Sequence, residues 1–386
     1  MKGIAGSPGQ RRRIVLVANT DWYLYNFRLS LARKLRDRGW DVHLVSPEGP
    51  YVERLRAEGF PWVGLALSRR GVFLPAEALT VLQMTSLYRK LRPEVVHHHT
   101  LKAVLYGSLA ARWAGVPHIV DSVTGLGYVF LSHQAAARLL RGLVLLGLRQ
   151  ALASPRVHVV FENSGDRDFF AARGLVRPLQ HSLIEGAGVD LNLYRFSPEP
   201  EGPPVVVLAS RMLWDKGVGD FVEAVRRLRV RLPTARFALV GAPDVGNPSS
   251  IPIEQIQSWV REGIVEWWGH RHDMPNVFAQ SHIVVLPSRG EGVPSVLLEA
   301  AASGRPVVAT DIPGCRDVVV EGETGSLVPP GEVKALTEAL ATLMGDPDMR
   351  NKMGARARAR AQERFDQEEV NVKTIAIYER LLAAGR

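Results

Sequence analysis

The most constraining feature of this sequence is a repeated alternation of short apolar runs with helical stripes that end at a glycine. An apolar run at Arg13–Asn19 precedes a helical stripe over Phe27–Arg38, which Gly39 ends. The further strands expected in the first half are Asp41–Ser46, Trp62–Leu67, Glu94–His98, His118–Ser122, Val157–Phe161 and Gln180–Ile184. Helices are expected between them at Tyr51–Glu58, Pro75–Leu91, Ala103–Ala114 and Ala135–Leu152. Buried strands that alternate with helices are typical of a doubly wound parallel sheet.

The same alternation of strands and helices starts again after a Gly- and Pro-rich segment at 186–204, which we interpret as a linker. The strands expected in this second half are Val205–Ala209, Phe237–Val240, Val265–Trp268, Ile283–Leu286, Val307–Thr310 and Ser326–Val328. Its helices are expected at Val218–Leu232, Ile253–Glu262, Ser295–Ser303 and Val333–Met344, with a last helix over 367–383. A chain of 386 residues is too long for one typical core. We therefore predict an α/β protein of two Rossmann-like lobes, with ligands at the carboxyl ends of both sheets.

Composition narrows the class of protein. Hydrophobic residues make up 46% and charged residues 23% of the chain, as in soluble globular proteins. No apolar run reaches the roughly 20 residues that a membrane span needs. The first 13 residues carry basic side chains but no apolar stretch after them, so we expect a loose leader rather than a signal peptide. Cys315 is the only cysteine, which fits a reducing cytoplasm, and we expect it to be a small buried side chain.

The net charge of +9 allows three kinds of partner: nucleic acid, an anionic membrane surface or a phosphorylated ligand. We expect no nucleic acid, because no helix-turn-helix, RRM, KH or zinc pattern is present. General solubility remains the alternative explanation for much of this charge.

The stretch Ser288–Asp311, SRGEGVPSVLLEAAASGRPVVATD, carries the most chemistry. Glu291 falls in the loop after a strand, Pro294 suits a first helical position, and Gly304 is expected to cap the helix. Glu299 lies two turns inside, so the two carboxylates are roughly 10 Å apart and suit one ligand held at two points. The free amides of Gly292, Val293 and Ser295 would form an anion site. The alternative is an ordinary strand–helix–strand unit with two surface glutamates.

This stretch, E-G-x-P-x-x-x-L-E-A-x-A-x-G-x-P-V-V-A-T-D, resembles the donor-site signature of retaining glycosyltransferase family four. The resemblance implies the GT-B fold, two Rossmann-like domains that face each other across a cleft. It implies that Glu291 contacts the transferred sugar and that Glu299 holds the ribose hydroxyls of a nucleotide-sugar. Gly292, Val293, Pro294 and Ser295 would then lie against the donor.

Two further donor-side segments fit the same family pattern. The segment Ser210–Gly217, SRMLWDKG, puts Arg211 and Lys216 where the family clamps the donor diphosphate, neutralising charge as the leaving group departs. The alternative is two surface cations at a strand end. After the strand near Val265–Trp268, family members present backbone to the nucleobase, so His270 and Arg271 are candidate neighbours of the base.

On the acceptor side we expect Asn19, His99, Thr124 and Gly125 to contact acceptor or sugar. Many family members have a histidine where this chain has Thr124, which puts an imidazole role at that position in doubt. The segment T-G-L-G at 124–127, the opening Asn26-Phe27-Arg28 and the loop 241–250 instead look like the subgroup that acts on diphospho-undecaprenol-linked saccharides.

The triplet His97-His98-His99 invites a metal interpretation. Neighbouring side chains in a strand point to opposite faces, so at most two of the three share a side, and no nearby ligand pattern completes a site. The Asp-x-Asp motif of metal-dependent transferases is absent, and we expect no metal and no cofactor.

Two stretches, Arg69–Leu74 and the helix Ala135–Leu152, mix arginines with leucines that look exposed, and such a surface can rest on anionic lipid. The alternative for the helix is a plain core element.

The predicted domains are 1–190, an acceptor-binding lobe completed by the helix at 367–386, and 191–366, a nucleotide-sugar-binding lobe. The predicted function is retaining, metal-independent transfer of a hexose or N-acetylhexosamine from a UDP-sugar to a polyprenyl-diphosphate-linked saccharide. It would take place on the inner face of the cytoplasmic membrane, in cell-surface polysaccharide or glycan assembly. The alternatives are a GT-B sugar-nucleotide epimerase or hydrolase, and a non-catalytic membrane-bound partner of polysaccharide assembly.

Overall fold

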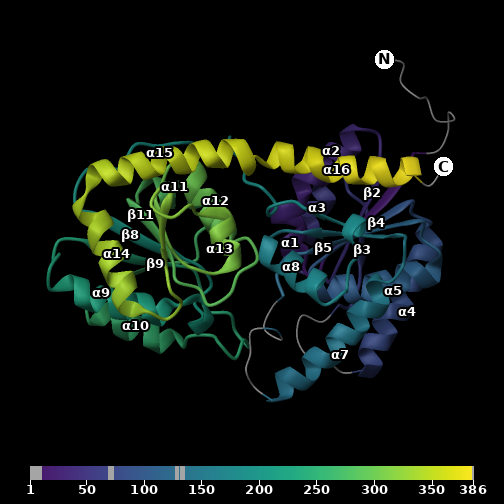
Figure 1. Ribbon diagram of the computed structural model, residues 1–386, viewed down its shortest axis with the longest axis horizontal. Helices are drawn as coiled ribbons and strands as arrows, with labels where there is room; N and C mark the ends of the chain where they lie inside the picture. The colour runs from purple at the N-terminus through teal and green to yellow at the C-terminus, as the bar shows by residue number, and fades with distance from the viewer. Residues whose placement is uncertain (1–10, 68–73, 127–129, 131–134, 385–386) are drawn as a thin grey trace. The chain divides into compact units, whose positions relative to one another are not determined.

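The structure is a computed structural model that describes residues 11–67, 74–126, 130 and 135–384 (Figure 1). The predictions made above for the leader at 1–10, the segment Arg69–Phe73 and Gly127 concern residues outside the described part of the chain. The chain divides into two compact units. Unit 1 holds the chain up to Glu162, then Asp166–Ile184 and the end of the chain from Asn371, and unit 2 holds Asn163–Gly165 and Glu185–Val370.

Unit 1 is built on a seven-stranded parallel sheet of order β3-β2-β1-β4-β5-β6-β7. Its strands are β1 (Arg13–Val17), β2 (Asp41–Ser46), β3 (Trp62–Gly64), β4 (Val95–His99), β5 (His118–Val123), β6 (Val157–Phe161) and β7 (His181–Leu183). Its helices are α1 (Asp21–Tyr23), α2 (Leu29–Asp37), α3 (Val52–Ala57), α4 (Leu74–Leu91), α5 (Leu101–Ala114), α7 (Ala135–Leu152) and α8 (Ser164–Ala172), with a π-helical turn η1 (Leu24–Arg28) and a 3-10 turn η2 (Pro178–Gln180).

Both faces of this sheet are covered. One face packs against α4, α5 and α7 in a cluster that includes Val15, Val96, Met84 and Leu148. The opposite face receives the end of α16 (Gln367–Ala384), where the Tyr378 hydroxyl lies 2.5 Å from His97 Nδ1. Strands covered on both faces can be apolar at every position, which is why they were visible in the sequence as continuous apolar runs.

Unit 2 is built on a six-stranded parallel sheet of order β10-β9-β8-β11-β12-β13. Its strands are β8 (Val205–Ala209), β9 (Arg236–Val240), β10 (Glu266–Gly269), β11 (Ile283–Leu286), β12 (Val307–Thr310) and β13 (Gly325–Val328). Its helices are α9 (Val218–Arg229), α10 (Ile253–Arg261), α11 (Met274–Ala279), α12 (Ser295–Ala302), α13 (Pro313–Val318), α14 (Val333–Gly345) and α15 (Pro347–Arg364), with a 3-10 turn η3 (Trp214–Lys216).

Two layers of helices enclose the second sheet. Helices α9, α10 and α14 share a core cluster with alternate strand residues such as Leu208 and Val285. Helices α12, α13 and α15 share another cluster with the intervening residues, among them Val284 and Ala309. Alternating strand residues thus point to opposite helical layers, so the sheet is doubly wound as predicted.

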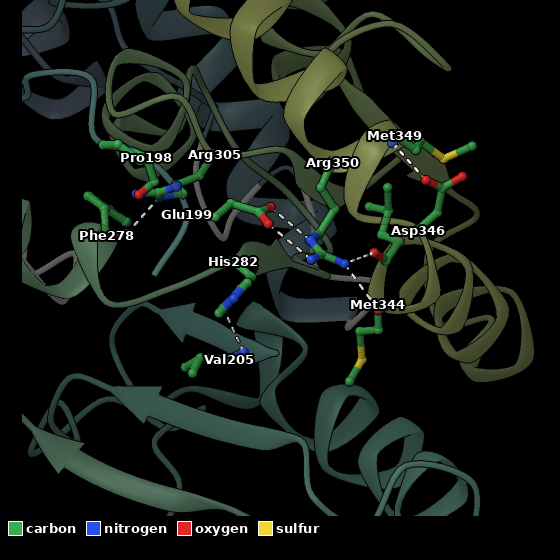
Figure 2. Close-up of polar contacts among 11 residues, drawn as sticks. Pro198, Glu199, Val205, Phe278, His282, Arg305, Met344, Asp346, Met349 and Arg350 are labelled. Atoms are coloured by element: carbon green, nitrogen blue, oxygen red, sulfur yellow. Dashed lines mark hydrogen bonds and ion pairs between the residues drawn. The ribbon is translucent and has the colours of Figure 1, made fainter. Parts of the chain in front are cut away.

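The end of the linker is fixed to unit 2 by two buried arginines (Figure 2). Arg305, 1% exposed, donates from Nε to the carbonyl of Phe278 at 2.8 Å and from Nη2 to Ser197 Oγ at 2.6 Å and Pro198 O at 2.9 Å. Arg350 bonds both oxygens of the Glu199 carboxylate, at 2.8 and 3.0 Å. A bidentate pair and a buried guanidinium hold the chain just before β8 in one path.

The structure corrects four local predictions. The first helix begins well before Phe27, because Thr20 Oγ1 caps it by accepting the Tyr23 amide at 3.1 Å, and the π-helical turn η1 lies inside it. Pro294 is the N-cap of α12 rather than its first helical residue, since its ψ of 114° is extended. Three short helices, α8, α11 and α13, were not predicted. Neither was α15, whose arginine-rich sequence shows little apolar periodicity.

No helix in the described part of the chain is long and apolar enough to cross a membrane.

Candidate active site

Two turns of unit 2 meet at the carboxyl ends of β8 and β11. Gly217, at φ +71°, ends η3, and a Cβ there would lie 2.0 Å from the carbonyl oxygen of Pro287. Only glycine permits this close approach. Arg289 N then donates to the carbonyl of Asp215 at 2.9 Å, and Ser288 Oγ donates to the same oxygen at 3.3 Å. These contacts bring the loop that carries Lys216 beside the loop that carries Glu291.

Lys216 and Glu291 form an ion pair at this junction. Lys216 Nζ donates to Glu291 Oε1 at 2.5 Å, and the two side chains are 19% and 11% exposed. The free thiol of Cys315 is buried nearby, as expected, and burial raises its pKa. A cation and a carboxylate with little contact with water are thus placed at the sheet edge where parallel α/β proteins bind ligands.

Arg211 follows β8, and its side chain binds a loop that was not predicted to contact it. Its Nη1 donates to Asp244 Oδ2 at 2.6 Å, and the Asn247 amide donates to the same oxygen at 3.1 Å. Gly241 makes this possible: at φ +138° it brings its backbone so close to Ser210 that a Cβ would lie 1.8 Å from that carbonyl oxygen. The guanidinium remains half exposed while Asp244 fixes one of its nitrogens.

Glu299 lies on α12 and is paired with a tyrosine of the linker. Desolvation of its carboxyl raises the pKa of Glu299 to about 8, although a hydrogen bond from Tyr194 opposes the shift. Tyr194 itself packs against Phe278 of α11, with ring centroids 6.0 Å apart. The linker therefore supplies a hydroxyl to the carboxylate that the family resemblance predicts to hold ribose.

The remaining donor-side residues lie at the entrance of α12 and after β10. Gly292, Val293 and Ser295 are half-buried, and the helix that follows them has first-turn amides without intrahelical partners. His270 is exposed and contacts His272, while Arg271 binds the Asp273 carboxylate through two hydrogen bonds of 2.7 and 2.6 Å. The donor roles of these residues stay predictions.

In unit 1 the predicted acceptor residues gather at one sheet edge. Asn19 follows β1, His99 ends β4, and Thr124 and Gly125 follow β5, and these three strands are neighbours in the sheet. Asn19, Thr124 and Gly125 are half-buried, whereas His99 is 0% exposed. The shared edge brings residues more than a hundred positions apart to one place.

The three consecutive histidines alternate between the faces of β4. His97 and His99 share one face, with ring centroids 3.9 Å apart, and His97 also contacts Ser122 and Tyr378. His98 points to the other face and bonds Asp121 and Tyr88 at 2.7 and 3.0 Å. Across residues 11–67, 74–126, 130 and 135–384, no group of three or more His, Cys, Asp or Glu side chains is arranged to hold a metal.

Four residues near the candidate sites were not identified from sequence: Tyr194, Asp244, Arg28 and Glu162. Tyr194 and Asp244 contact predicted residues of unit 2, and Arg28 and Glu162 form a buried ion pair in unit 1 at 2.7 Å. Arg28 was quoted only as part of a subgroup motif. Glu162 directly follows β6 and Asp244 comes shortly after β9, at strand ends that parallel sheets use for ligands, whereas no such signal was available for Tyr194 and Arg28.

Two family models match separate parts of the chain: "Glycosyl transferase 4-like" over residues 13–153 and "Glycosyl transferases group 1" over residues 203–346. A GDP-mannose-dependent alpha-(1-6)-phosphatidylinositol monomannoside mannosyltransferase of Mycolicibacterium smegmatis is 30% identical over 68% of this chain and 72% of its own length. The chain belongs to the glycosyltransferases of family four.

Two other relatives of this glycosyltransferase carry more detailed names. It is 26% identical, over 96% of its own length and 99% of the relative's, to the N,N'-diacetylbacillosaminyl-diphospho-undecaprenol alpha-1,3-N-acetylgalactosaminyltransferase of Campylobacter jejuni. It is 24% identical to the UDP-Gal:alpha-D-GlcNAc-diphosphoundecaprenol alpha-1,3-galactosyltransferase of Escherichia coli, over 81% of this chain and 82% of that one.

Among solved structures, that of Anabaena Alr3699/HepE in complex with UDP matches with a TM-score of 0.77. The match covers 95% of this chain and 99% of that one at 21% identity, which bears on the fold alone. The two parallel-sheet α/β domains and this neighbour confirm the predicted GT-B fold.

Proposed function

We propose that this glycosyltransferase moves a hexose or N-acetylhexosamine from a UDP-sugar to a saccharide linked to a polyprenyl diphosphate, with retention of anomeric configuration. The observation that carries the donor half of the proposal is the Lys216–Glu291 pair at the carboxyl edge of the unit 2 sheet, next to the N-terminus of α12. One cation for a phosphate, one carboxylate for sugar hydroxyls and a set of backbone amides converge there.

The acceptor half rests on likeness. The relatives from C. jejuni and E. coli are both named for transfer to diphospho-undecaprenol-linked saccharides, and both match more than four-fifths of this chain. The relatives support the nucleobase of the donor less well than they support the acceptor, because the donors in their names include both UDP-Gal and GDP-mannose. We choose UDP because the T-G-L-G segment and the opening Asn26-Phe27-Arg28 resemble the subgroup that acts on diphospho-undecaprenol-linked saccharides, and the E. coli transferase to such a saccharide is named for UDP-Gal.

The reaction proposed is a front-face displacement. The bond between the sugar C1 and the UDP oxygen breaks while the acceptor oxygen bonds to C1 from the same face. The acceptor hydroxyl proton passes to the departing phosphate, so UDP and the lengthened lipid-linked saccharide are the products. Lys216 and Arg211 stabilise the charge that grows on the phosphate, Glu291 positions the sugar, and Glu299 binds the ribose. No enzyme nucleophile, metal or cofactor takes part in this scheme.

We further propose that the protein works at the inner face of the cytoplasmic membrane. Leu139, Leu143 and Leu146 of α7 are 74%, 59% and 60% exposed, and they recur at the spacing of one helical face. The same helix carries Arg138, Arg141 and Arg149. An apolar stripe flanked by arginines suits an anionic bilayer surface, on which a polyprenyl diphosphate resides.

The experiment is product analysis by mass spectrometry. Purified protein is incubated with UDP-, GDP- and ADP-sugars, with and without GlcNAc-diphospho-undecaprenol in detergent. Addition of one hexose or N-acetylhexosamine to the lipid, from a UDP-sugar only, is the expected result. Turnover of the donor without any lipid would replace the proposal by the epimerase or hydrolase. Donor binding without turnover of either substrate would favour the non-catalytic partner.

A further inference from the structure

A buried charged cluster at the carboxyl edge of the unit 1 sheet takes no part in the scheme above. The Arg28 guanidinium donates to three side chains: from Nε to His99 Nδ1 at 3.1 Å, and from Nη2 to Glu162 Oε1 at 2.7 Å and Tyr23 Oη at 2.8 Å. Arg28 and Glu162 are each only 6% exposed. Arg28 ends the π-helical turn η1, and such turns occur often at functional sites.

This cluster fixes the tautomer of His99. A guanidinium has donors only and stays protonated in proteins, so the Nδ1 atom that faces Arg28 must accept. Burial, together with the charges of His97 and Arg28, holds the pKa of His99 well below its usual value, so the ring is neutral. A neutral imidazole with an accepting Nδ1 carries its proton on Nε2. His99 therefore presents an N–H donor on its far side.

That donor has no protein partner. In the described part of the chain, His99 Nε2 and Thr100 Oγ1 are the two buried side-chain polar atoms without a hydrogen bond. Thr100 also holds φ at +78°, a conformation that a β-branched residue rarely adopts. Unpaired buried polar atoms are rare, and backbone strain concentrates at binding and catalytic sites. Two adjacent unpaired groups and a strained residue at one strand end point to a ligand that completes them.

The charge of the cluster selects the class of ligand. The positive charge of Arg28 is opposed by Glu162 at 2.7 Å, so the groups left for a ligand are a neutral N–H and a hydroxyl. A phosphate is held best by an uncompensated cation, whereas a sugar hydroxyl or an acetamido carbonyl needs only a neutral donor. We propose that His99 and Thr100 bind an oxygen of the acceptor's saccharide, and that Arg28 and Glu162 are positioning residues that fix the His99 tautomer. This inference rests on the proposed lipid-linked saccharide acceptor.

The first test reads the His99 ring directly by NMR of protein labelled with 15N-histidine, the signal being assigned by its loss in His99→Gln. The expected spectrum of the free protein shows a neutral ring protonated at Nε2, and GlcNAc-diphospho-undecaprenol shifts that signal while undecaprenyl diphosphate without sugar does not. A ring protonated at Nδ1, or a charged ring, overturns the tautomer argument. An equal shift with the sugarless lipid overturns the saccharide assignment.

The free-protein spectrum needs no substrate, so it separates this inference from the proposed function. If the Nε2–H tautomer is present but neither lipid shifts it, the saccharide site is overturned, and the mass-spectrometric assay decides separately whether the lipid-linked saccharide is the acceptor. If the tautomer is absent while the lipid-linked saccharide is still lengthened in the mass-spectrometric assay, the proposed function stands and only the site is overturned.

Two variants test the hydrogen-bond donor of His99. In His99→Asn the amide oxygen replaces Nδ1 and still accepts from Arg28, but the donor is lost. In His99→Gln the amide nitrogen reaches the position of Nε2 and keeps a donor. We expect the KM for GlcNAc-diphospho-undecaprenol to rise about tenfold in His99→Asn, which corresponds to about 1.4 kcal/mol for the lost hydrogen bond, and about threefold in His99→Gln. Thermal unfolding of each variant reports whether unit 1 is folded, and equal KM values in the two variants contradict the proposal.

Discussion

Lys216 Nζ lies 2.5 Å from Glu291 Oε1, although 75 residues separate them in the chain. The contact exists because Gly217 lets the η3 turn approach Pro287 so closely that no side chain fits between them. In the free protein each residue neutralises the other. In the proposed reaction this ion pair opens when the sugar diphosphate binds, and the ammonium then contacts the phosphate while the carboxylate contacts the sugar.

Replacing Lys216 by alanine should lower kcat far more than it raises the KM for the donor. The charge that Lys216 meets grows as the phosphate departs, so its contribution belongs to the transition state. We expect a loss of roughly 10²- to 10³-fold in kcat. Steady-state kinetics of Lys216→Ala against Arg289→Ala, an exposed cation of the neighbouring loop, isolates the effect. Equal turnover in the two variants would refute the phosphate role.

The stability of the free protein should fall with rising pH because of Glu299. Its folded pKa is about 8, while an unconstrained glutamate titrates near 4.5. Between these values the folded state binds more protons, so the free energy of unfolding decreases as pH rises from about 4.5 to about 8. The total is at most about 5 kcal/mol, since each pKa unit is worth about 1.4 kcal/mol.

The measurement is urea unfolding at a series of pH values for the parent protein and Glu299→Gln. The glutamine has no charge to bury, so the difference between the two proteins should grow in favour of the variant from pH 5 to pH 9. A difference that stays constant across this range would show that the carboxyl of Glu299 is not desolvated.

The strained backbone of Thr100 should lower the stability of the protein. Thr100→Gly removes the strain of a β-branched residue at φ +78°, which costs the folded state about 1–3 kcal/mol. The greater conformational freedom of glycine in the unfolded chain offsets part of this gain. We expect a net gain of roughly 1 kcal/mol in the free energy of unfolding. Thr100→Ala loses the same hydroxyl but keeps the strain, so it should gain less stability than Thr100→Gly. If alanine stabilises as much as glycine, the backbone at this position is not strained.

Arg305 should matter for stability rather than for catalysis. Arg305→Met leaves the carbonyls of Phe278 and Pro198 and the hydroxyl of Ser197 buried without their donor, which we expect to cost about 2–4 kcal/mol. Arg195→Met, an exposed arginine of the same linker, should change stability by less than about 0.5 kcal/mol. Thermal unfolding compares the two, and similar losses would mean that the linker is not anchored through Arg305.

Substitution of Leu139, Leu143 and Leu146 together by serine should weaken binding to anionic vesicles. Each leucine buried in a bilayer contributes about 1.5–3 kcal/mol, so the loss should exceed tenfold. Flotation with phosphatidylglycerol vesicles measures it. A control variant with Leu179, Leu193 and Val230 changed to serine removes exposed apolar side chains outside α7 and should float like the parent. Equal flotation of both variants would show that α7 is not the contact.

The sequence predicted the fold because its strands are buried on both faces and therefore appear as continuous apolar runs. Lys216 and Glu291 were expected at one donor site because both match the family's donor pattern, and the ion pair between them shows that they do lie together. Other contacts left no such trace. Arg28 and Glu162 are 134 positions apart, and a buried ion pair has no periodic signature. Helix α15 was missed because alanines and arginines largely replace the apolar stripe, its arginines being used to bond carbonyls such as Val318 O and Ala302 O.

The stereochemistry of transfer tests the central claim most directly. The lengthened lipid-linked saccharide made from an α-configured UDP-sugar is isolated, and its new anomeric proton is examined by NMR. The scheme built on Lys216, Arg211 and Glu291 predicts an α-linked product with a small coupling to H2, because the acceptor bonds to C1 from the face that UDP leaves. A β-linked product with a large coupling would contradict it and would require an attack from the opposite face.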